Sequence, residues 1–251
     1  MLAALEALLD RWRGASDPDP ELQAWIDETY AWAVRELGAD GASALVEPTD
    51  RFFPDRARNP EEAARLTFAQ VKAHAGMESW ECELVAQPAD PDPRVQPHLA
   101  LQGAPSSPAG TYRGRRGDAA TITYDPELVR DPEALVATFA HELAHFRMSR
   151  VRSRPPGGAE HEEPATDLVA VFLGFGVFVA NSAFSFRQYT DTGSQGWQAR
   201  RQGYLGEREL TYALARFCHH RGTPTTTATR HLDPHLRPLL RRALRRLRAG
   251  R

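Results

Sequence analysis

The residues best suited to chemistry in this 251-residue chain are two histidines four positions apart, His141 and His145, with Glu142 beside the first. On an α-helix, residues i and i+4 lie one turn apart on the same face, so both imidazole rings can reach one metal ion. Glu142 is then placed next to that ion, where a carboxylate can act as a general base. The spacing predicts a zinc-binding helix. The alternative is a buried helix whose histidines only hydrogen-bond to their neighbours.

The residues before this pattern favour a buried helix. Asp131 is a suitable N-cap, Pro132 can occupy the first helical position, and Glu133 places an acid in the first turn. The residues from there to Ala140 are nearly all apolar. A catalytic zinc site needs this setting, because a dry wall and fixed ligand rotamers set the geometry of the metal.

A catalytic zinc has three protein ligands and keeps a further position open, so the sequence must supply a third ligand. Glu163, 18 residues after His145 at the start of a second apolar segment, is the predicted one. Asp167 lies one turn later and could accept the free N–H of His141 or His145, which would fix the tautomer of that ligand. Other interpretations stay open: Glu163 could be a helix N-cap, and Asp167 could pair with a loop arginine. The substitutes for the third ligand are His161, Glu162 and Asp167.

The two motifs His141-Glu142-Leu143-Ala144-His145 and Glu163-Pro164-Ala165-Thr166-Asp167 together resemble the zincin metallopeptidases, specifically the gluzincins, in which HExxH is followed by ExxxD on the next helix. The run from Asp167 to Asn181 also resembles bacterial zincin-like proteins. The resemblance covers about residues 60–180. It implies zinc at His141, His145 and Glu163, Glu142 as the general base, and a peptide or protein substrate.

The chain departs from zincin patterns at three positions. Arg147 stands where an apolar residue is usual, and Met148 and Val151 occupy the positions of the glycine and third histidine of metzincins. The metzincin branch is therefore excluded. A hydrolase also needs a donor for the developing oxyanion; the candidates are Tyr189, Tyr204, His219 and His220.

Periodicity and capping residues predict the elements that would position these side chains. Helices are expected over residues 20–37, Pro60 to about Ala75, from Pro132 through the HExxH motif, Glu163 to Phe178, Glu207 to about His219, and Pro234 to about Leu247. Strands are expected over 80–85, 98–101 and 120–124, with turns at 88–97 and 103–117 and a loop at 149–162. Strand 120–124 could present an edge to an extended peptide.

The predicted fold class is α+β, predominantly helical. It has a zincin-like core in which a small sheet precedes the metal helix and the glutamate helix. We expect residues 1–58 to form an N-terminal helical extension and residues 59–251 to form the metal-binding domain with the C-terminal helices, packed as one unit.

Composition and charge narrow the class of protein. Hydrophobic residues make up 41% and charged residues 25%, as in ordinary soluble proteins. Cys82 and Cys218 are too few and too far apart for a disulfide framework. Residues 1–10 contain two acids and no basic leader, and the longest apolar run, 168–180, is short for a membrane span. We therefore expect a cytoplasmic protein with no membrane partner.

Two other functions are compatible with the sequence. One is a zincin-derived protein that binds zinc without hydrolysing a substrate, although such a protein would need no base at Glu142. The other is nucleic-acid binding through residues 237–251, which hold seven arginines and no acid and leave a formal charge of −9 for the rest of the chain, since the total is −2. Nucleic acid is the less favoured partner: no aromatic residues are interleaved with the arginines, and the apolar stripe Leu240, Ala243, Leu244 and Leu247 is typical of a helix that docks on its own domain.

Overall fold

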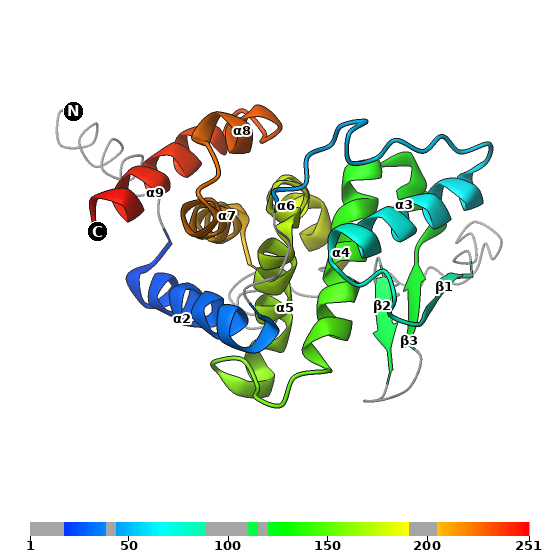
Figure 1. The fold of residues 1–251 in the computed structure, drawn as a ribbon, viewed down its shortest axis with the longest axis horizontal. Coiled ribbons are helices and arrows are strands. Elements are labelled where there is room, and N and C mark those ends of the chain that lie inside the picture. Colours follow the sequence, from blue (N-terminus) through cyan, green and yellow to red (C-terminus); the bar gives the residue numbers. More distant parts are fainter. Residues whose placement is uncertain (1–17, 39–43, 89–109, 115–119, 191–204, 251) are drawn as a thin grey trace, which may run out of the picture.

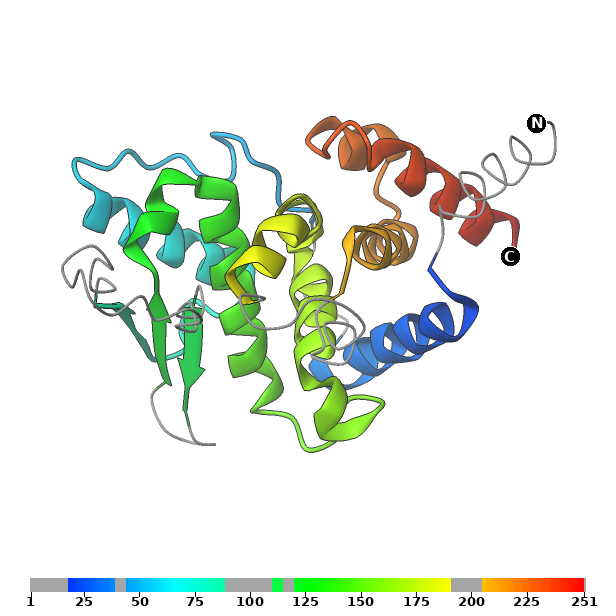
Figure 2. The same ribbon diagram turned by 180° about the vertical axis from the view of Figure 1, so that it is seen from behind.

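The computed structural model of the protein describes residues 18–38, 44–88, 110–114, 120–190 and 205–250, with the backbone alone for residues 184–190. A small sheet lies at one end of the molecule, and helices make up the rest, as the two opposite views show (Figures 1 and 2). The predicted α+β, mostly helical class is therefore confirmed. Residues 1–17, the predicted strand 98–101 and Tyr204 lie outside the described residues.

Three helices begin in the same way, with a proline after an aspartate or asparagine. They are α2 (Pro20–Leu37), α3 (Pro60–His74) and α4 (Pro132–Met148). The side chains of Asp19, Asn59 and Asp131 accept hydrogen bonds from backbone N–H groups in the first turn. These caps satisfy donors that have no partner inside the helix, and proline needs none, so the predicted helix starts are confirmed.

The sheet has the strand order β1-β3-β2, made of β1 (Cys82–Ala86), β2 (Gly110–Arg113) and β3 (Ala120–Tyr124). β1 pairs parallel to β3, and β2 pairs antiparallel to it. The prediction that residues 120–124 present a free edge is wrong, because β3 is paired on both sides. The edges are β1 and β2, and β2 falls inside the segment 103–117 that we predicted as turns.

Aromatic side chains join the sheet to α3 and α4. Phe139 of α4 makes edge contacts with Tyr124 of β3 and with Phe68 of α3, at centroid distances of 5.7 and 5.2 Å. All three side chains are buried. The core between sheet and helices therefore fixes α4 against β3, and α4 also packs against β2.

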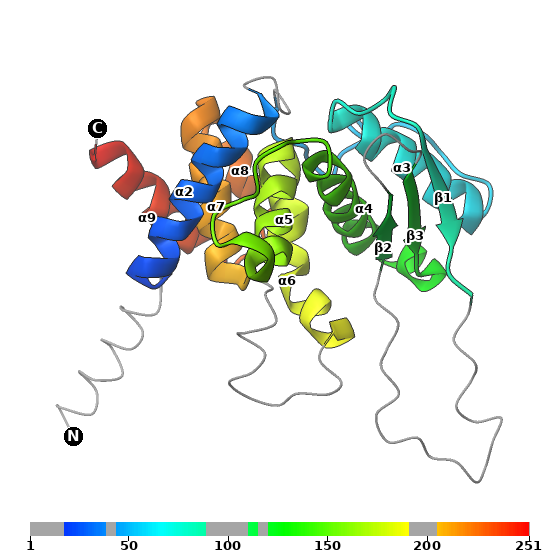
Figure 3. The ribbon, with the colours of Figure 1, turned by 90° about the horizontal axis from the view of Figure 1, so that it is seen from below.

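The apolar segment after Glu163 is divided into two helices. α5 (Glu162–Ala170) passes through a π-helical turn at Val171–Phe175 into α6 (Gly176–Thr190). Gly174 in that turn has φ of 99°, a backbone conformation that residues with a Cβ rarely adopt. The single continuous helix that we predicted is therefore wrong beyond Ala170, and the break lets α6 take a different direction from α5 (Figure 3).

The C-terminal helices are α7 (Glu207–Arg221), α8 (Thr225–Arg230) and α9 (Arg237–Ala249). α7 packs against α2, α6 and α9. Leu240, Ala243 and Leu244 of α9 are buried while most of its arginines are exposed, so the predicted docking face is confirmed. α9 begins three residues later than predicted because Leu236 N–H closes a turn on the carbonyl of Asp233. The short α8 was not predicted.

Buried side chains from α2 to α9 form one hydrophobic cluster. Among the described residues one helical stretch, Gly158–Ala183, is long and apolar enough to cross a membrane, and 94% of its most apolar window is buried inside the protein. A buried core helix of a globular protein passes the same test of length and apolar composition. α4 and α5 lie side by side between the sheet and the group of α2, α7 and α9 (Figure 3).

Candidate metal centre

α4 presents His141, Glu142 and His145 within the core of the molecule. His141 and Glu142 are each 5% exposed, and the side chain of His145 is 15% exposed. The two rings meet edge to face at 4.8 Å between centroids, as expected for one face of a helix. The predicted metal helix thus brings both imidazoles to the same place.

α5 brings a carboxylate to the two imidazoles. Glu163 Oε2 lies 3.2 Å from His141 Nε2 and 3.5 Å from His145 Nε2. Each of the three residues offers one ligand atom, these atoms lie within 4.8 Å of one another, and the group could hold a metal ion. The ligand set predicted from sequence is therefore assembled in space.

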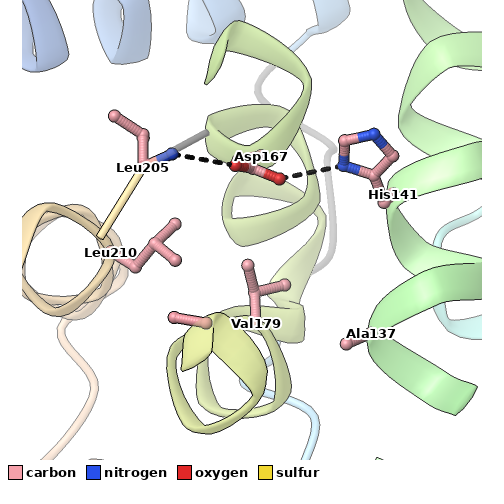
Figure 4. A pocket seen from close by; sticks show the side chains of 7 residues that line it. Ala137, His141, Asp167, Val179, Leu205 and Leu210 are labelled. Carbon is pink, nitrogen blue, oxygen red and sulfur yellow. Dashed lines mark hydrogen bonds and ion pairs between the residues drawn. The ribbon is translucent and has the colours of Figure 1, made fainter. Parts of the chain in front are cut away.

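Asp167 holds the opposite side of the His141 ring. Its Oδ1 lies 2.9 Å from His141 Nδ1, and its Oδ2 accepts a hydrogen bond of 3.4 Å from the backbone N–H of Leu205 (Figure 4). Asp167 is 7% exposed and pairs with His141. This is one of the two histidine partners predicted for it, the alternative prediction being a pair with a loop arginine. Because Nδ1 is engaged with this carboxylate, Nε2 is the His141 nitrogen that faces Glu163.

The substitutes considered for the third ligand lie elsewhere. His161 Nδ1 bonds to the carbonyl of Gly157 at 3.2 Å, and its ring packs against Trp25. Glu162 is exposed at the first position of α5. Asp167 is occupied by His141. Glu163 is therefore the carboxylate that the fold places between the two Nε2 atoms.

Burial and hydrogen bonding shift the acidity of these groups. Burial lowers the pKa of His141, but its hydrogen bonds with Asp167 and Glu163 outweigh burial and hold the pKa well above the usual value. The hydrogen bond between His141 and Glu163, and a second one between His145 and Glu163, lower the pKa of the Glu163 carboxyl group. Burial raises the pKa of Glu142, although the two histidines oppose this. A buried carboxylate with a raised pKa beside residues that could hold a metal ion is suited to taking up and releasing a proton.

The edge strand β2 passes close to Glu142. A Cβ added at Gly110 would lie 2.7 Å from Thr138 Cγ2, 3.0 Å from the carbonyl oxygen of Thr123 and 3.1 Å from Glu142 Oε1. Only glycine allows the strand to approach α4 this closely. This contact was not predicted, because β2 lies in a glycine- and proline-containing stretch that we predicted as turns.

Two of the candidate oxyanion donors, His219 and His220, are not brought to the cluster. His220 Nδ1 lies 3.2 Å from Tyr30 OH, and His219 lines a separate cavity between α2, α7 and α9. Both lie more than two helical turns beyond Leu210, the α7 residue near Asp167. Tyr189 and Tyr204 are outside the side chains that the structure describes. The predictions for His219 and His220 are therefore wrong.

Thr166 is a site residue that sequence reasoning missed. Its Oγ1 lies 3.3 Å from His145 Nδ1 and 2.8 Å from the carbonyl oxygen of Glu162. A sequence signal existed, because Thr166 is three residues after Glu163 and shares its helix face. The prediction from sequence covers only the two acids of this helix face, Glu163 and Asp167.

Arg147, the departure from the zincin pattern, faces away from the cluster. Its guanidinium donates to the carbonyl oxygen of Leu37 at the end of α2 and lies over the ring of Trp80. Burial lowers the pKa of Arg147. The residue therefore joins α4 to the end of α2.

Apolar side chains close the side of the cluster that faces α6 and α7. A cavity of about 10 Å³ lies there, and Figure 4 shows its lining: Ala137, His141, Asp167, Val179, Ala183, Leu205 and Leu210. This volume has room for about one water molecule. The pair of His141 and Asp167 is therefore shielded from bulk solvent on this side.

Comparisons of the chain with protein-family models, with curated proteins and with solved structures found no match. The site must accordingly be interpreted from its own geometry.

Proposed function

We propose that this protein is a zinc-dependent hydrolase of the metallopeptidase kind, with His141, His145 and Glu163 as metal ligands and Glu142 as the general base. The observation that carries the proposal is the convergence of His141 Nε2 and His145 Nε2 on one oxygen of Glu163, at 3.2 and 3.5 Å. Ligand atoms 2.0–2.2 Å from a tetrahedral zinc lie about 3.3–3.6 Å from one another. The two distances to Glu163 Oε2 are close to that range, and all three atoms lie within 4.8 Å of one another.

The chemistry of the donor set also fits zinc. Two neutral imidazoles and one carboxylate are the ligands of the catalytic zinc in several hydrolases, and a set of three protein ligands leaves a further position for water or substrate. Zinc bound here would supply Lewis acidity, which polarises a carbonyl oxygen and makes a water molecule more acidic.

Glu142 is placed to move the proton in such a reaction. It adjoins both histidines and Glu163 closely enough for their charges to shift its pKa, and burial raises that pKa. Its carboxylate would take a proton from the attacking water and pass it to the leaving amine nitrogen. The burial of an acid is costly, so a role for Glu142 in proton transfer explains its position better than a role in stability.

The order of elements supports a relation to the gluzincins. A backing helix (α3), a small sheet (β1 to β3), the HExxH helix (α4) and the glutamate helix (α5) follow one another in the chain, in the order we expect for a compact zincin core. Under this proposal the substrate is a peptide or protein, and the protein acts in the cytoplasm. The alternative is a zinc-binding protein of zincin origin without hydrolytic activity.

Metal analysis is the first test. Wild-type protein should contain one zinc per chain by mass spectrometry, His141→Ala and Glu163→Ala should lose it, and Glu142→Gln should keep it. Glu162→Gln and His161→Ala are matched controls, since these neighbours lie outside the cluster, and both should keep zinc. Retention of zinc by Glu163→Ala, or no zinc in the reconstituted wild type, would refute the assigned ligand set.

Turnover separates the hydrolase from the non-hydrolytic alternative. The zinc-loaded protein should cleave members of a proteome-derived peptide mixture, and Glu142→Gln with full zinc should be at least ~100-fold slower, the usual contribution of a positioned acid or base. Equal cleavage by wild type and Glu142→Gln would assign the activity to a contaminant. A zinc-loaded wild type without cleavage would favour the alternative.

A further inference from the structure

One turn of α5 carries three groups that face α4. Glu163, Thr166 and Asp167 are at positions i, i+3 and i+4, which share one face of a helix. Glu163 contacts both Nε2 atoms, Asp167 contacts Nδ1 of His141, and Thr166 contacts Nδ1 of His145. Each ring of α4 therefore has its own Nδ1 partner on α5, and the two partners are adjacent in sequence.

The hydroxyl of Thr166 has a defined orientation. Thr166 is fully buried. Its O–H donates to the carbonyl oxygen of Glu162 at 2.8 Å, a bond to a backbone acceptor one turn earlier on the same helix. The other acceptor within reach, Met148 Sδ at 3.5 Å, is more distant and is a weaker acceptor than a carbonyl oxygen. Since the hydroxyl hydrogen is used in the bond to Glu162, Oγ1 presents a lone pair to His145 Nδ1 at 3.3 Å.

This orientation determines which nitrogen of His145 carries the proton. A neutral imidazole has one N–H, and the hydrogen bond made by one ring nitrogen fixes the role of the other. An acceptor at Nδ1 holds the proton there and leaves the lone pair of Nε2 directed toward Glu163. Asp167 does the same for His141, with a charged acceptor in place of a neutral one.

We propose that Thr166 is a positioning residue that fixes the ring and tautomer of His145 for metal binding, as the neutral counterpart of Asp167. The inference rests on the proposed metal site and goes beyond its ligands. The two acceptors differ in charge. The hydroxyl of Thr166 orients its ring without adding a further buried negative charge to those of Asp167 and Glu142. The site thereby keeps more of the positive field that its metal would supply.

Zinc affinity tests the proposal. Thr166→Val keeps the shape of the side chain and removes the acceptor, and Thr166→Ser restores it. Thr29→Val is a matched control: Thr29 is also fully buried, lies on α2, and its hydroxyl has no hydrogen-bond partner among the described residues. In competition with a chelator of known affinity, zinc should bind Thr166→Val at least ~10-fold more weakly than wild type, the usual effect of losing such a partner. Thr166→Ser should stay within about threefold of wild type, and Thr29→Val should be unchanged.

The tautomer gives a second measurement, which a merely structural role would not change. In long-range ¹H–¹⁵N spectra of the zinc-loaded protein, the Nδ1–H signal of His145 should be protected from exchange in wild type and Thr166→Ser, and should be lost or exchange rapidly in Thr166→Val. If Thr166→Val does not fold, Thr166→Ala takes its place in both measurements. Equal zinc affinity and an unchanged Nδ1–H signal in a folded variant would overturn the role of Thr166 alone. A wild type that binds no zinc would instead overturn the proposed function, and this inference with it.

Discussion

At the scale of single residues, Gly110 controls how closely the sheet approaches the proposed base. The strand edge, the methyl group of Thr138 and Oε1 of Glu142 meet within a space that has no room for a Cβ. Glu142 is buried, so its carboxylate has few alternative positions. The conformation of the base therefore depends on a residue that has no chemistry of its own.

Gly110→Ala should destabilise the protein by ~1–3 kcal/mol, the usual cost of overpacking, because the new methyl group would lie 2.7 Å from Thr138 Cγ2. Thermal unfolding measures the cost. The double variant Gly110→Ala/Thr138→Ser removes that methyl contact and should recover part of the stability. Recovery will be incomplete because the contacts to Thr123 and Glu142 remain. An unchanged melting temperature in the single variant, or no recovery in the double one, would contradict this account.

The side chains of the candidate metal centre were predictable where their spacing along one helix carries the information. His141, Glu142 and His145 follow from i and i+4 spacing, and Glu163 and Asp167 from the same rule on the next helix. The contact of Gly110 was not predictable in this way, because it depends on how β2 packs against α4. Thr166 has the spacing of that helix face, but only the packing of α5 against α4 brings its hydroxyl to His145. The predictions for His219 and His220 were wrong because no periodicity links α7 to the cluster.

At the scale of elements, α2 holds the loop that joins α4 and α5, the two helices of the candidate metal centre. The indole N–H of Trp25 donates to the carbonyl oxygen of Pro156 at 3.0 Å, and that of Trp32 donates to Ser153 Oγ at 2.9 Å. The loop is rich in proline, glycine and arginine and has little regular structure. Because it leads from His145 to Glu163, its attachment to α2 helps to fix the distance between these two residues.

Trp32→Phe should loosen this loop. The lost hydrogen bond is worth about 1 kcal/mol, which corresponds to an approximately fivefold larger open population. Limited proteolysis with trypsin after Arg152, an exposed loop residue, should accelerate by about that factor. Ser153→Ala removes the acceptor with little change in packing and should reproduce the effect, and the double variant should add little to it. Additive effects of the two substitutions would show that packing, and not the hydrogen bond, holds the loop.

Element boundaries were predictable where capping chemistry is written in the sequence. The pairs Asp19-Pro20, Asn59-Pro60 and Asp131-Pro132 mark helix starts that the structure reproduces. The break at Gly174 was not predictable, because the apolar run around it is continuous and only the tertiary position of its backbone requires a positive φ. Strand β2 was missed because its four residues gain their conformation from pairing with β3.

At the scale of the whole molecule, α7 connects the candidate metal centre to α9. Its start lies beside Asp167, through the backbone of Leu205 and the side chain of Leu210. Its far end carries Cys218, which is completely buried, and α9 packs along its length. α2 lies before the boundary that we predicted between residues 58 and 59, and α7 lies after it. The two helices pack against each other, so contacts join the two predicted parts of the chain.

The reactivity of Cys218 can decide whether the metal centre and the C-terminal helices unfold together. Burial raises the pKa of this thiol to about 12, above its value in the unfolded chain, so the thiol stays protonated and unreactive at pH 8 unless the structure opens. The buried, protonated thiol therefore contributes stability that is present at neutral pH and is lost as the pH rises through about 9 toward 12.

In a Cys82→Ser background, labelling of Cys218 should slow by about 100-fold when free zinc is 100 times its dissociation constant, because opening a single cooperative unit must release the metal. His141→Ala in the same background should show no zinc effect. A labelling rate independent of zinc in the zinc-binding protein would mean that α7 and α9 open on their own, and that the chain consists of two units joined at α7.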